Sequence, residues 1–392
     1  MKKVLFMLSS MNIGGVEKSL LSLLSEIPKE KYDITILLLE KKGEFLKYIP
    51  DWVKVEEASW FHSVKPIIMQ PPQQTIKDYV KNKQYFKIPV FLFSYFISKY
   101  FKNRYFYYRQ VFKSISPNDN TYDVAISYQG PTDIIDFYIA HKVKATKKIS
   151  WVHFDISKHQ VNKKLYAKLY KEFNKIYVVS KEAKRHLIEQ IPVAKIKADT
   201  FMNIVPANLI IEMAKETIQF DETYKGIKVV TVGRLSKEKG QDMAINVLSR
   251  LRKDGYDVRW YCIGDGNDRK EYEKQINDND LQTDFLLLGS TPNPYPYILN
   301  SDIYVQTSRH EGYCLTLAEA KCLLKPIITT NFTGAYEQLK DGYNGLIAEC
   351  NEDELYKRLK YLIENPLQRT RLTENLKNNQ LKSNIKSKMF SI

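Results

Sequence analysis

Residues 228–252, KVVTVGRLSKEKGQDMAINVLSRLR, place a short apolar run, a glycine turn and an amphipathic stretch in immediate succession. The run suits a strand buried on both faces, and apolar residues return at helical spacing after Gln241. Gly233 permits a tight turn, and Arg234 and Lys239 follow in a loop where two cations can converge on one anion, such as a diphosphate. The alternative is that both cations are simply solvated on a strand-to-helix loop.

The same alternation of short apolar runs and amphipathic stretches recurs in both halves of the chain, which is typical of an open α/β sheet with parallel strands. Strands are expected at 3–8, 32–40, 123–128, 148–153, 176–180 and 197–205, and again at 228–235, 259–264, 285–289, 303–307, 327–330 and 346–349. Helices are expected at 16–24, 241–252, 315–323 and 353–363.

The length of 392 residues exceeds what one hydrophobic core usually organises, so two domains are expected. The strand pattern stops before Pro206, which separates an N-terminal domain of residues 1–205 from a C-terminal domain of residues 206–365. The first domain carries a basic, aromatic insertion at about 60–120. Residues 366–392 form a polar, helical tail that is expected to pack back toward the first domain.

The composition narrows the class of partner. The net charge of +15 requires an anionic partner, yet the sequence contains no recognisable nucleic-acid-binding module. The four cysteines form no CxxC pair, which favours a reduced, cytoplasmic protein without a metal site. No apolar run is long enough to span a bilayer, and the run at 4–8 is too short for a signal peptide.

A second stretch follows the expected strand at 303–307 and reads HEGYCLTLAEA, residues 310–320. Its residues Gly312, Tyr313, Cys314 and Leu315 would open a helix whose free N–H groups form a ready phosphate site. Glu311 would lie at the mouth of that loop. Glu319, two turns into the helix, could accept hydrogen bonds from ribose hydroxyls, although a surface-exposed Glu319 is the alternative.

A third stretch, NIGGVEK at residues 12–18, follows the first expected strand. The paired Gly14 and Gly15 allow a ligand close to the backbone. The spacing is not GxGxxG, so a nicotinamide or flavin cofactor is not favoured, and a simple tight turn is the alternative.

In this order, the three stretches resemble glycosyltransferase family 4, whose members have the GT-B fold. The resemblance extends to SWVHFD at 150–155, VVS at 178–180, Asn203, GDG at 264–266, and the positions Gly334, Glu337, Gly342 and Gly345. It implies an α/β protein with two Rossmann-like domains facing each other across a cleft. It also implies a retaining transfer of a sugar from a nucleotide-diphosphate sugar, with a UDP-sugar expected, and with neither a metal nor a cofactor.

The resemblance assigns roles to single residues. Arg234 and Lys239 hold the donor diphosphate together with the loop at 312–315, Glu319 holds the ribose, and Glu311 faces the donor sugar as a catalytic residue. His153 lies near the reacting sugar as a second catalytic residue, although a lone histidine after a strand is more often structural. The other implied positions are Gly14 and Gly15 at the donor phosphate or acceptor, and Asn203 and Ser180 in the cleft. Cys314 departs from the family, which usually has Gly or Pro there.

The acceptor is expected to be a cell-envelope glycan, a lipid-linked saccharide or a polymer. Between residues 61 and 120, ten Lys or Arg residues face two acidic ones, and aromatics are interleaved with cations at 85–113. Lys99, Lys102, Arg104 and Arg109 would meet anionic lipid at the cytoplasmic face of the membrane. The alternative is that these aromatics are buried in the first domain.

Two other functions remain open from the sequence: a nucleotide-sugar-binding protein without transfer activity, and a GT-B epimerase. A phosphorylase is not favoured, because it would need a lysine for pyridoxal phosphate in a much longer chain.

Overall fold

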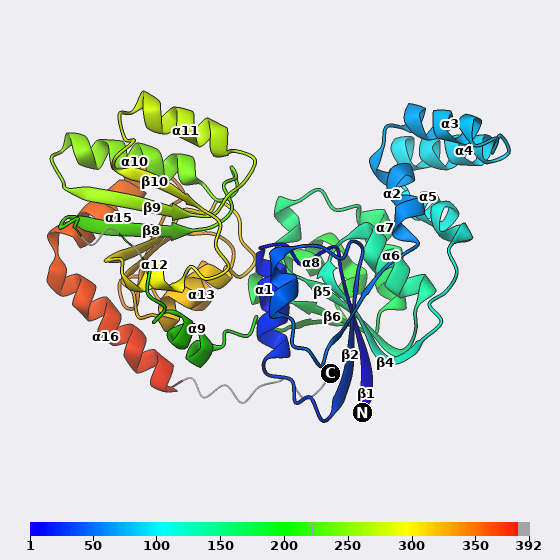
Figure 1. Cartoon of the computed structure of the whole chain (residues 1–392), viewed down its shortest axis with the longest axis horizontal. Helices are drawn as coiled ribbons and strands as arrows, with labels where there is room; N and C mark the ends of the chain where they lie inside the picture. Colours follow the sequence, from blue (N-terminus) through cyan, green and yellow to red (C-terminus); the bar gives the residue numbers. More distant parts are fainter. Residues whose placement is uncertain (219, 221–222, 383–392) are drawn as a thin grey trace. The chain divides into compact units, whose positions relative to one another are not determined.

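The computed structural model describes residues 1–218, 220 and 223–382. It divides the chain into two compact units, one of residues Met1–Met202 and one that begins at Asn203. The division lies three residues before the boundary expected from the sequence. Each unit consists of one parallel β-sheet flanked by helices (Figure 1).

The N-terminal unit contains a seven-stranded sheet with the order β3-β2-β1-β4-β5-β6-β7. Its strands are β1 (Lys2–Leu8), β2 (Tyr32–Leu38), β3 (Lys54–Glu57), β4 (Thr121–Gly130), β5 (Lys144–Val152), β6 (Lys175–Val178) and β7 (Ala198–Thr200). Its helices are α1 (Gly15–Leu24), α2 (Phe61–Met69), α3 (Pro72–Lys81), α4 (Lys87–Tyr100), α5 (Arg104–Val111), α6 (Asp133–Lys142), α7 (Lys163–Glu172) and α8 (Lys181–Gln190).

The edge strands of this sheet differ from the sequence expectation. Strand β3 was not expected, because its sequence KVEE offers one apolar residue and three charged ones. The strand at 197–205 was expected to be long, but β7 has only three residues. Both are edge strands, where one side of the backbone has no strand partner and burial imposes little apolar pattern.

The insertion expected at about 60–120 consists of helices α2 to α5, which leave the sheet after β3 and return to it at β4 (Figure 1). One part of its aromatic content packs into the core of the unit: Phe91, Tyr107, Tyr108 and Phe112 are buried. Other large apolar side chains, most of them aromatic, are exposed on α4 and in its flanking turns: Tyr85, Phe86, Val90, Leu92, Phe93, Phe96, Tyr100 and Phe101. The alternative that these aromatic side chains are buried in the first domain is therefore correct for only part of the insertion.

The C-terminal unit contains a six-stranded sheet with the order β10-β9-β8-β11-β12-β13. Its strands are β8 (Ile227–Val232), β9 (Val258–Ile263), β10 (Phe285–Gly289), β11 (Ile303–Gln306), β12 (Ile327–Thr330) and β13 (Leu346–Ala348). Its helices are α9 (Ala207–Met213), α10 (Gln241–Lys253), α11 (Arg269–Asp278), α12 (Tyr295–Leu299), α13 (Leu315–Cys322), α14 (Ala335–Gln338), α15 (Glu352–Glu364) and α16 (Pro366–Lys382).

Consecutive residues of β8 lie in two different hydrophobic cores of this unit. Val229 packs in the core under α10, α11 and α15, whereas Val230 packs in the core with α9, α12 and α13. These helices cover opposite faces of the sheet (Figure 1). Continuous apolar runs were therefore the correct signal for strands that are buried on both sides.

Helix α16 packs on the C-terminal unit, because Leu372 and Leu376 are buried in its two cores. The tail was expected to pack toward the first domain, but residues 383–392 lie outside the described residues, so that part stays a prediction. Among the described helices, none combines the length and the apolar character that crossing a membrane requires.

Candidate functional site

Two of the singled-out loops lie where the C-terminal sheet changes direction. From β8 the chain proceeds outward through β9 and β10, and β11 then returns to the other side of β8. The loops after β8 and β11 therefore leave the carboxyl ends of adjacent strands at a topological switch point. This is where open α/β sheets bind their ligands.

Glycines let these backbones approach closely. Gly240 has φ +71°, and a Cβ on it would lie 2.3 Å from the carbonyl oxygen of Thr307 in the other loop. Gly264 has φ +146°, and a Cβ there would lie 2.0 Å from the oxygen of Gly233. A side chain at either position would push the loop after β8 out of place.

Hydrogen bonds fix the loop after β8 to the loop after β11. The Thr307 hydroxyl donates to the Lys239 oxygen at 2.7 Å, and the Arg309 backbone N–H donates to the Glu238 oxygen at 2.7 Å. The Arg309 guanidinium donates to the Lys237 oxygen at 2.7 Å and to both carboxylate oxygens of Asp242 at 2.8 and 2.7 Å. Such a bidentate contact fixes orientation as well as distance.

Lys239 and Glu311, which the sequence proposed for diphosphate and sugar, form an ion pair. The Ser308 hydroxyl also donates to Glu311 Oε1, at 3.0 Å. Burial by itself lowers the pKa of Lys239, but the charge and hydrogen bond of Glu311 outweigh it, so the pKa is raised. Lys239 is therefore a fixed cation, held in place by a carboxylate before any ligand arrives.

Arg234 differs from Lys239 because its side chain is 67% exposed and lies 3.7 Å from Glu238. Its positive charge acts on Lys239, whose pKa it lowers slightly against the effect of Glu311. The structure thus places an exposed and a half-buried cation on one loop. That both bind one diphosphate stays a prediction.

The loop at 312–315 leads into α13, which begins at Leu315 with Cys314 as its N-cap. Cys314 has φ +62°, a left-handed conformation that favours glycine, which is one of the two residues that the resemblance implies at this position. The buried Gln338 of α14 donates to the carbonyl oxygens of Tyr313 and Cys314 and supports this turn. Burial raises the pKa of the Cys314 thiol, which therefore stays protonated.

Glu319 lies on the inward face of α13 and is only 2% exposed. It accepts a hydrogen bond from the Tyr295 hydroxyl at 3.3 Å. The alternative of a surface-exposed Glu319 is therefore wrong. Burial of Tyr295 raises the pKa of its hydroxyl, and the negative charge of Glu319 and the hydrogen bond to it raise that pKa further.

In the N-terminal unit, Gly14 is the N-cap of α1 and Gly15 its first residue. The Glu17 carboxylate folds over this turn, and a Cβ on Gly14 would lie 2.4 Å from it. The paired glycines thus open a helix at the carboxyl end of β1, next to the switch point between β1 and β4.

His153 follows β5 at the same edge of this sheet, and its ring lies 4.7 Å from that of Tyr128 and 6.1 Å from that of Trp151. The Tyr128 hydroxyl bonds the Ser19 hydroxyl of α1 at 2.8 Å, which links His153 to the glycine-led helix. Burial lowers the pKa of His153 to about 3. The imidazole is therefore neutral near pH 7, and its buried Nε2 has no hydrogen-bond partner among the described residues.

Two further residues proposed for the cleft have more local positions. Ser180 is fully buried, and its hydroxyl accepts from the Ala183 N–H at 3.2 Å as the N-cap of α8. Asn203 is half-buried and is the first residue of the C-terminal unit. Among the described residues, no group of three or more His, Cys, Asp or Glu side chains is arranged to hold a metal ion.

With this geometry in view, the comparison with known proteins is specific. Residues 214–379 match the family model of glycosyl transferases group 1. The match covers the loops after β8 and β11 and most of the C-terminal unit.

Curated relatives match over part of their length. The chain is 28% identical over 206 residues to an N-acetylgalactosaminyltransferase of Campylobacter jejuni that acts on N-acetylgalactosamine-N,N'-diacetylbacillosaminyl-diphospho-undecaprenol; this covers 52% of the chain and 54% of that protein. It is 30% identical over 123 residues to the poly(glycerol-phosphate) alpha-glucosyltransferase of Bacillus subtilis, which covers 31% of the chain and 18% of that protein. The chain spans about half the length, or less, of the curated relatives it matches.

Solved structures match over nearly the whole chain. Anabaena HepE in complex with UDP and glucose has a TM-score of 0.71 at 17% identity, covering 97% of this chain and 95% of that one. TarM has a TM-score of 0.68 at 14% identity, covering 100% and 97%. At these identities the likeness shows the fold, which is GT-B: two Rossmann-like units, each built on a parallel sheet.

The sequence did not indicate Arg309, Asp242 or Gln338 as site residues. Each acts through a contact with a distant part of the chain: Arg309 and Asp242 are 67 residues apart, and Gln338 and Tyr313 are 25 apart. A signal existed only for Arg309, which directly precedes the singled-out stretch at 310–320.

Proposed function

We propose that the protein is a retaining, metal-independent glycosyltransferase. It moves a sugar from a nucleotide-diphosphate sugar, specifically a UDP-sugar, to a cell-envelope glycan, lipid-linked saccharide or polymer. The observation that carries the proposal is the half-buried Lys239–Glu311 pair at the switch point, within the segment that matches the glycosyltransferase family. The acceptor class is supported by the undecaprenol-linked and poly(glycerol-phosphate) acceptors that two relatives' names give.

The chemistry follows the positions of the charges. The bond between the donor's anomeric carbon and the β-phosphate oxygen breaks, and its electron pair leaves with the diphosphate. Lys239, Arg234 and the N–H groups at the start of α13 stabilise that growing negative charge, which in other enzymes a metal ion often does. The acceptor oxygen bonds the anomeric carbon on the face that the diphosphate leaves, and its proton passes to the departing phosphate oxygen.

Glu311 and His153 act at the sugar. When the diphosphate binds Lys239, the Glu311 carboxylate is free to accept a hydrogen bond from a sugar hydroxyl. His153 is neutral and therefore accepts or donates a hydrogen bond rather than supplying a charge. Glu319, on the inward face of α13, binds the ribose hydroxyls.

The protein works at the cytoplasmic face of the membrane and attaches to it reversibly. The exposed apolar side chains of α4 and the lysines around them support this part of the proposal. Such attachment would hold a lipid-linked acceptor near the unit that carries α1 and His153.

The test is binding and transfer with Lys239→Ala and Arg234→Ala. Charged hydrogen bonds of this kind contribute about 1.5–3 kcal/mol, so each variant should lose roughly tenfold to a hundredfold in UDP affinity. Isothermal titration with UDP measures this, and circular dichroism verifies the fold. Lys237→Ala, on the same loop, is the matched control. Undiminished UDP binding in both variants would refute the donor site, and transfer that EDTA abolishes and magnesium restores would refute metal independence.

A further inference from the structure

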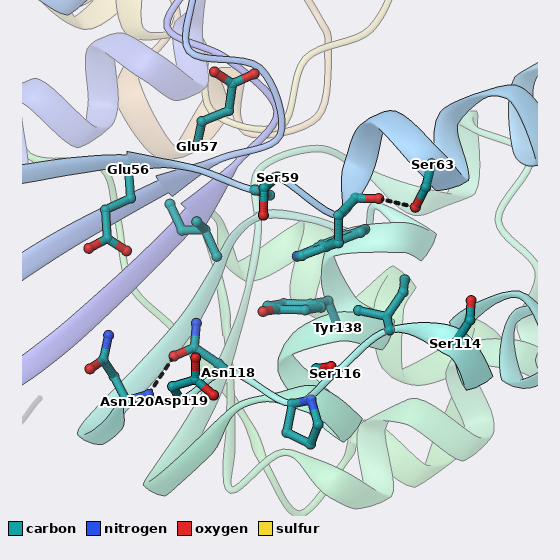
Figure 2. A pocket seen from close by; sticks show the side chains of 15 residues that line it. Glu56, Glu57, Ser59, Ser63, Ser114, Ser116, Asn118, Asp119, Asn120 and Tyr138 are labelled. Atoms are coloured by element: carbon teal, nitrogen blue, oxygen red, sulfur yellow. Dashed lines mark hydrogen bonds between the residues drawn. The ribbon is translucent and has the colours of Figure 1, made fainter.

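A polar cavity of about 500 Å³ lies in the N-terminal unit, where the helical insertion joins the sheet (Figure 2). One wall is formed by residues 56–60 and 63, at the point where the chain leaves β3 for α2. The other wall is formed by residues 114–120, which lead from α5 back to β4, and Tyr138 of α6 completes it. The cavity therefore contacts both ends of the insertion, and it uses none of the residues assigned to the donor.

The lining consists mostly of hydrogen-bonding groups. Figure 2 shows carboxylate, amide and hydroxyl side chains gathered around the space: Glu56, Glu57, Asp119, Asn118, Asn120, Ser59, Ser63, Ser114 and Ser116. Among the described residues that line it, there is no Lys, Arg or His. In a chain of net charge +15, this cavity is thus a place that does not suit a phosphate or another anion.

Two of the three carboxylates are already partnered. Glu56 forms an ion pair with Lys54 at 2.5 Å, and Glu57 lies 3.3 Å from His62 Nε2. These neighbours weaken the attraction of the cavity for a free cation. The hydrogen-bond acceptors and donors that line the cavity suit neutral hydroxyl groups, because each hydroxyl can donate to a carboxylate and accept from an amide.

Two aromatic side chains add to the lining. Trp60 and Tyr138 stack with ring centroids 4.5 Å apart and an interplanar angle of 21°. The stacked rings give the otherwise polar cavity an apolar wall.

We propose that this cavity is a saccharide-binding site that takes a neutral, polyhydroxylated part of the acceptor glycan. Its size lies within the roughly 300–1,000 Å³ of small-ligand pockets. Only the identification of the saccharide as acceptor rests on the proposed function; saccharide binding itself does not. A bound saccharide would contact both ends of the insertion and so sense the position of α2 to α5.

The experiment is saturation-transfer NMR on the full chain with UDP in excess. The probes are maltose, cellobiose, lactose and N,N'-diacetylchitobiose, with spermidine as a cationic comparison. Ser59→Trp fills the cavity from an exposed position, and Asp119→Ala removes an exposed carboxylate, so both should fold normally. We expect a saturation-transfer signal on at least one disaccharide of the wild-type complex. This signal should be at least fivefold weaker in both variants. Lys113→Ala, next to the wall but outside the lining, should leave it unchanged.

The outcomes separate this site from the donor site. The proposal is overturned if no disaccharide shows a saturation-transfer signal, or if the signal in Ser59→Trp equals that in the wild type. A signal on spermidine instead of the disaccharides, abolished by Ser59→Trp, assigns the cavity to cations and also overturns the proposal. Thermal shift with UDP on the same samples reports the donor site. If a saccharide binds but UDP does not shift the melting temperature, the cavity proposal stands and the proposed function is refuted.

Discussion

Lys239 is a half-buried cation whose charge Glu311 balances in the ligand-free protein. Donor binding brings a second set of negative charges to the same ammonium group. Neutralising Glu311 should therefore affect the free protein and the donor complex in opposite ways, because an uncompensated buried charge is strongly destabilising.

We predict that Glu311→Gln lowers the melting temperature of the free protein and increases the shift that UDP produces, since the diphosphate then supplies the missing negative charge. Turnover should fall by roughly a hundredfold or more, while UDP affinity is maintained or rises. Differential scanning fluorimetry and a transfer assay measure these effects. Glu271→Gln, at an exposed position of α11 away from both loops, is the control. If UDP raises the melting temperature of Glu311→Gln less than that of the wild type, Glu311 and the diphosphate do not balance the same charge on Lys239.

His153 gives a pH signature. Its folded-state pKa of about 3 lies below the usual value of 6.5, so the unfolded chain binds the proton first as pH falls. The neutral imidazole thus favours the folded state fully above pH 6.5, and this stability is lost as pH falls from 6.5 toward 3, by up to about 1.4 kcal/mol per unit. Buried Asp136, whose pKa burial raises to about 6, contributes with the opposite sign between pH 6 and 4.

We therefore predict that His153→Gln loses less stability than the wild type between pH 7 and pH 5, because Asp136 is common to both proteins and cancels. Urea unfolding at the two pH values measures the difference. The pH profile of turnover should show no ionisation of His153 between pH 5 and 8. Equal pH slopes in the two proteins would show that the imidazole is not desolvated.

At the scale of elements, the donor-side geometry depends on how the loop after β8 is fixed to the loop after β11. Arg309 makes the contact with the most bonds, to Asp242 at the start of α10 and to the Lys237 oxygen. Among the described residues, the hydrogen bonds of its side chain reach neither the side chains of Arg234 and Lys239 nor Glu311, so Arg309 is a positioning residue.

Arg309→Ala should weaken UDP binding about tenfold, because Lys239 would no longer be held against Glu311, and it should raise the donor KM more than it lowers kcat. Arg309→Lys should rescue only part, since a lysine cannot form the bidentate contact. Arg250→Ala is a matched control: it breaks an arginine–aspartate pair of 2.6 Å on the same helix, α10, with the exposed Asp353. An equal loss of UDP affinity in both variants would mean that general destabilisation is the cause.

The elements also show what the sequence could predict. The interior strands appeared as apolar runs because they are buried on both faces, and the loops of the site followed because they directly succeed those strands. The charged edge strand β3 carried no such pattern. The Arg309–Asp242 contact was equally hidden, because the periodicity of a single stretch contains no information on which distant loop will lie beside it.

At the scale of the whole molecule, the positive charge and the exposed apolar surface coincide on the insertion. Lys83, Lys87, Lys99 and Lys102 are exposed beside the apolar side chains of α4. Arg104 was expected to face lipid as well, but it forms an ion pair with Asp133 at 2.7 Å and is half-buried, so its role is to hold α5 to α6. A charge reversal at Arg104 would therefore test folding instead of membrane binding.

The membrane prediction thus becomes a test of three lysines. Each cation near an anionic surface contributes about 1 kcal/mol, and aromatic rings prefer the headgroup level. Lys83→Glu, Lys87→Glu and Lys99→Glu combined should reduce binding to phosphatidylserine-containing vesicles at least tenfold in a sedimentation assay. The wild type should be released by salt and should bind neutral vesicles weakly.

The matched control reverses three exposed lysines on the C-terminal unit, Lys253, Lys270 and Lys274, which gives the same change in net charge. If general charge attraction were responsible, both triple variants would lose binding equally. If the insertion is the attachment surface, only the first does. Replacing Phe93 and Phe96 with serine should also weaken binding to the anionic vesicles, because these exposed rings supply the apolar contribution. A wild-type protein that ignores anionic vesicles at low salt would refute the attachment, and the excess charge would then point to a phosphate-bearing polymer acceptor.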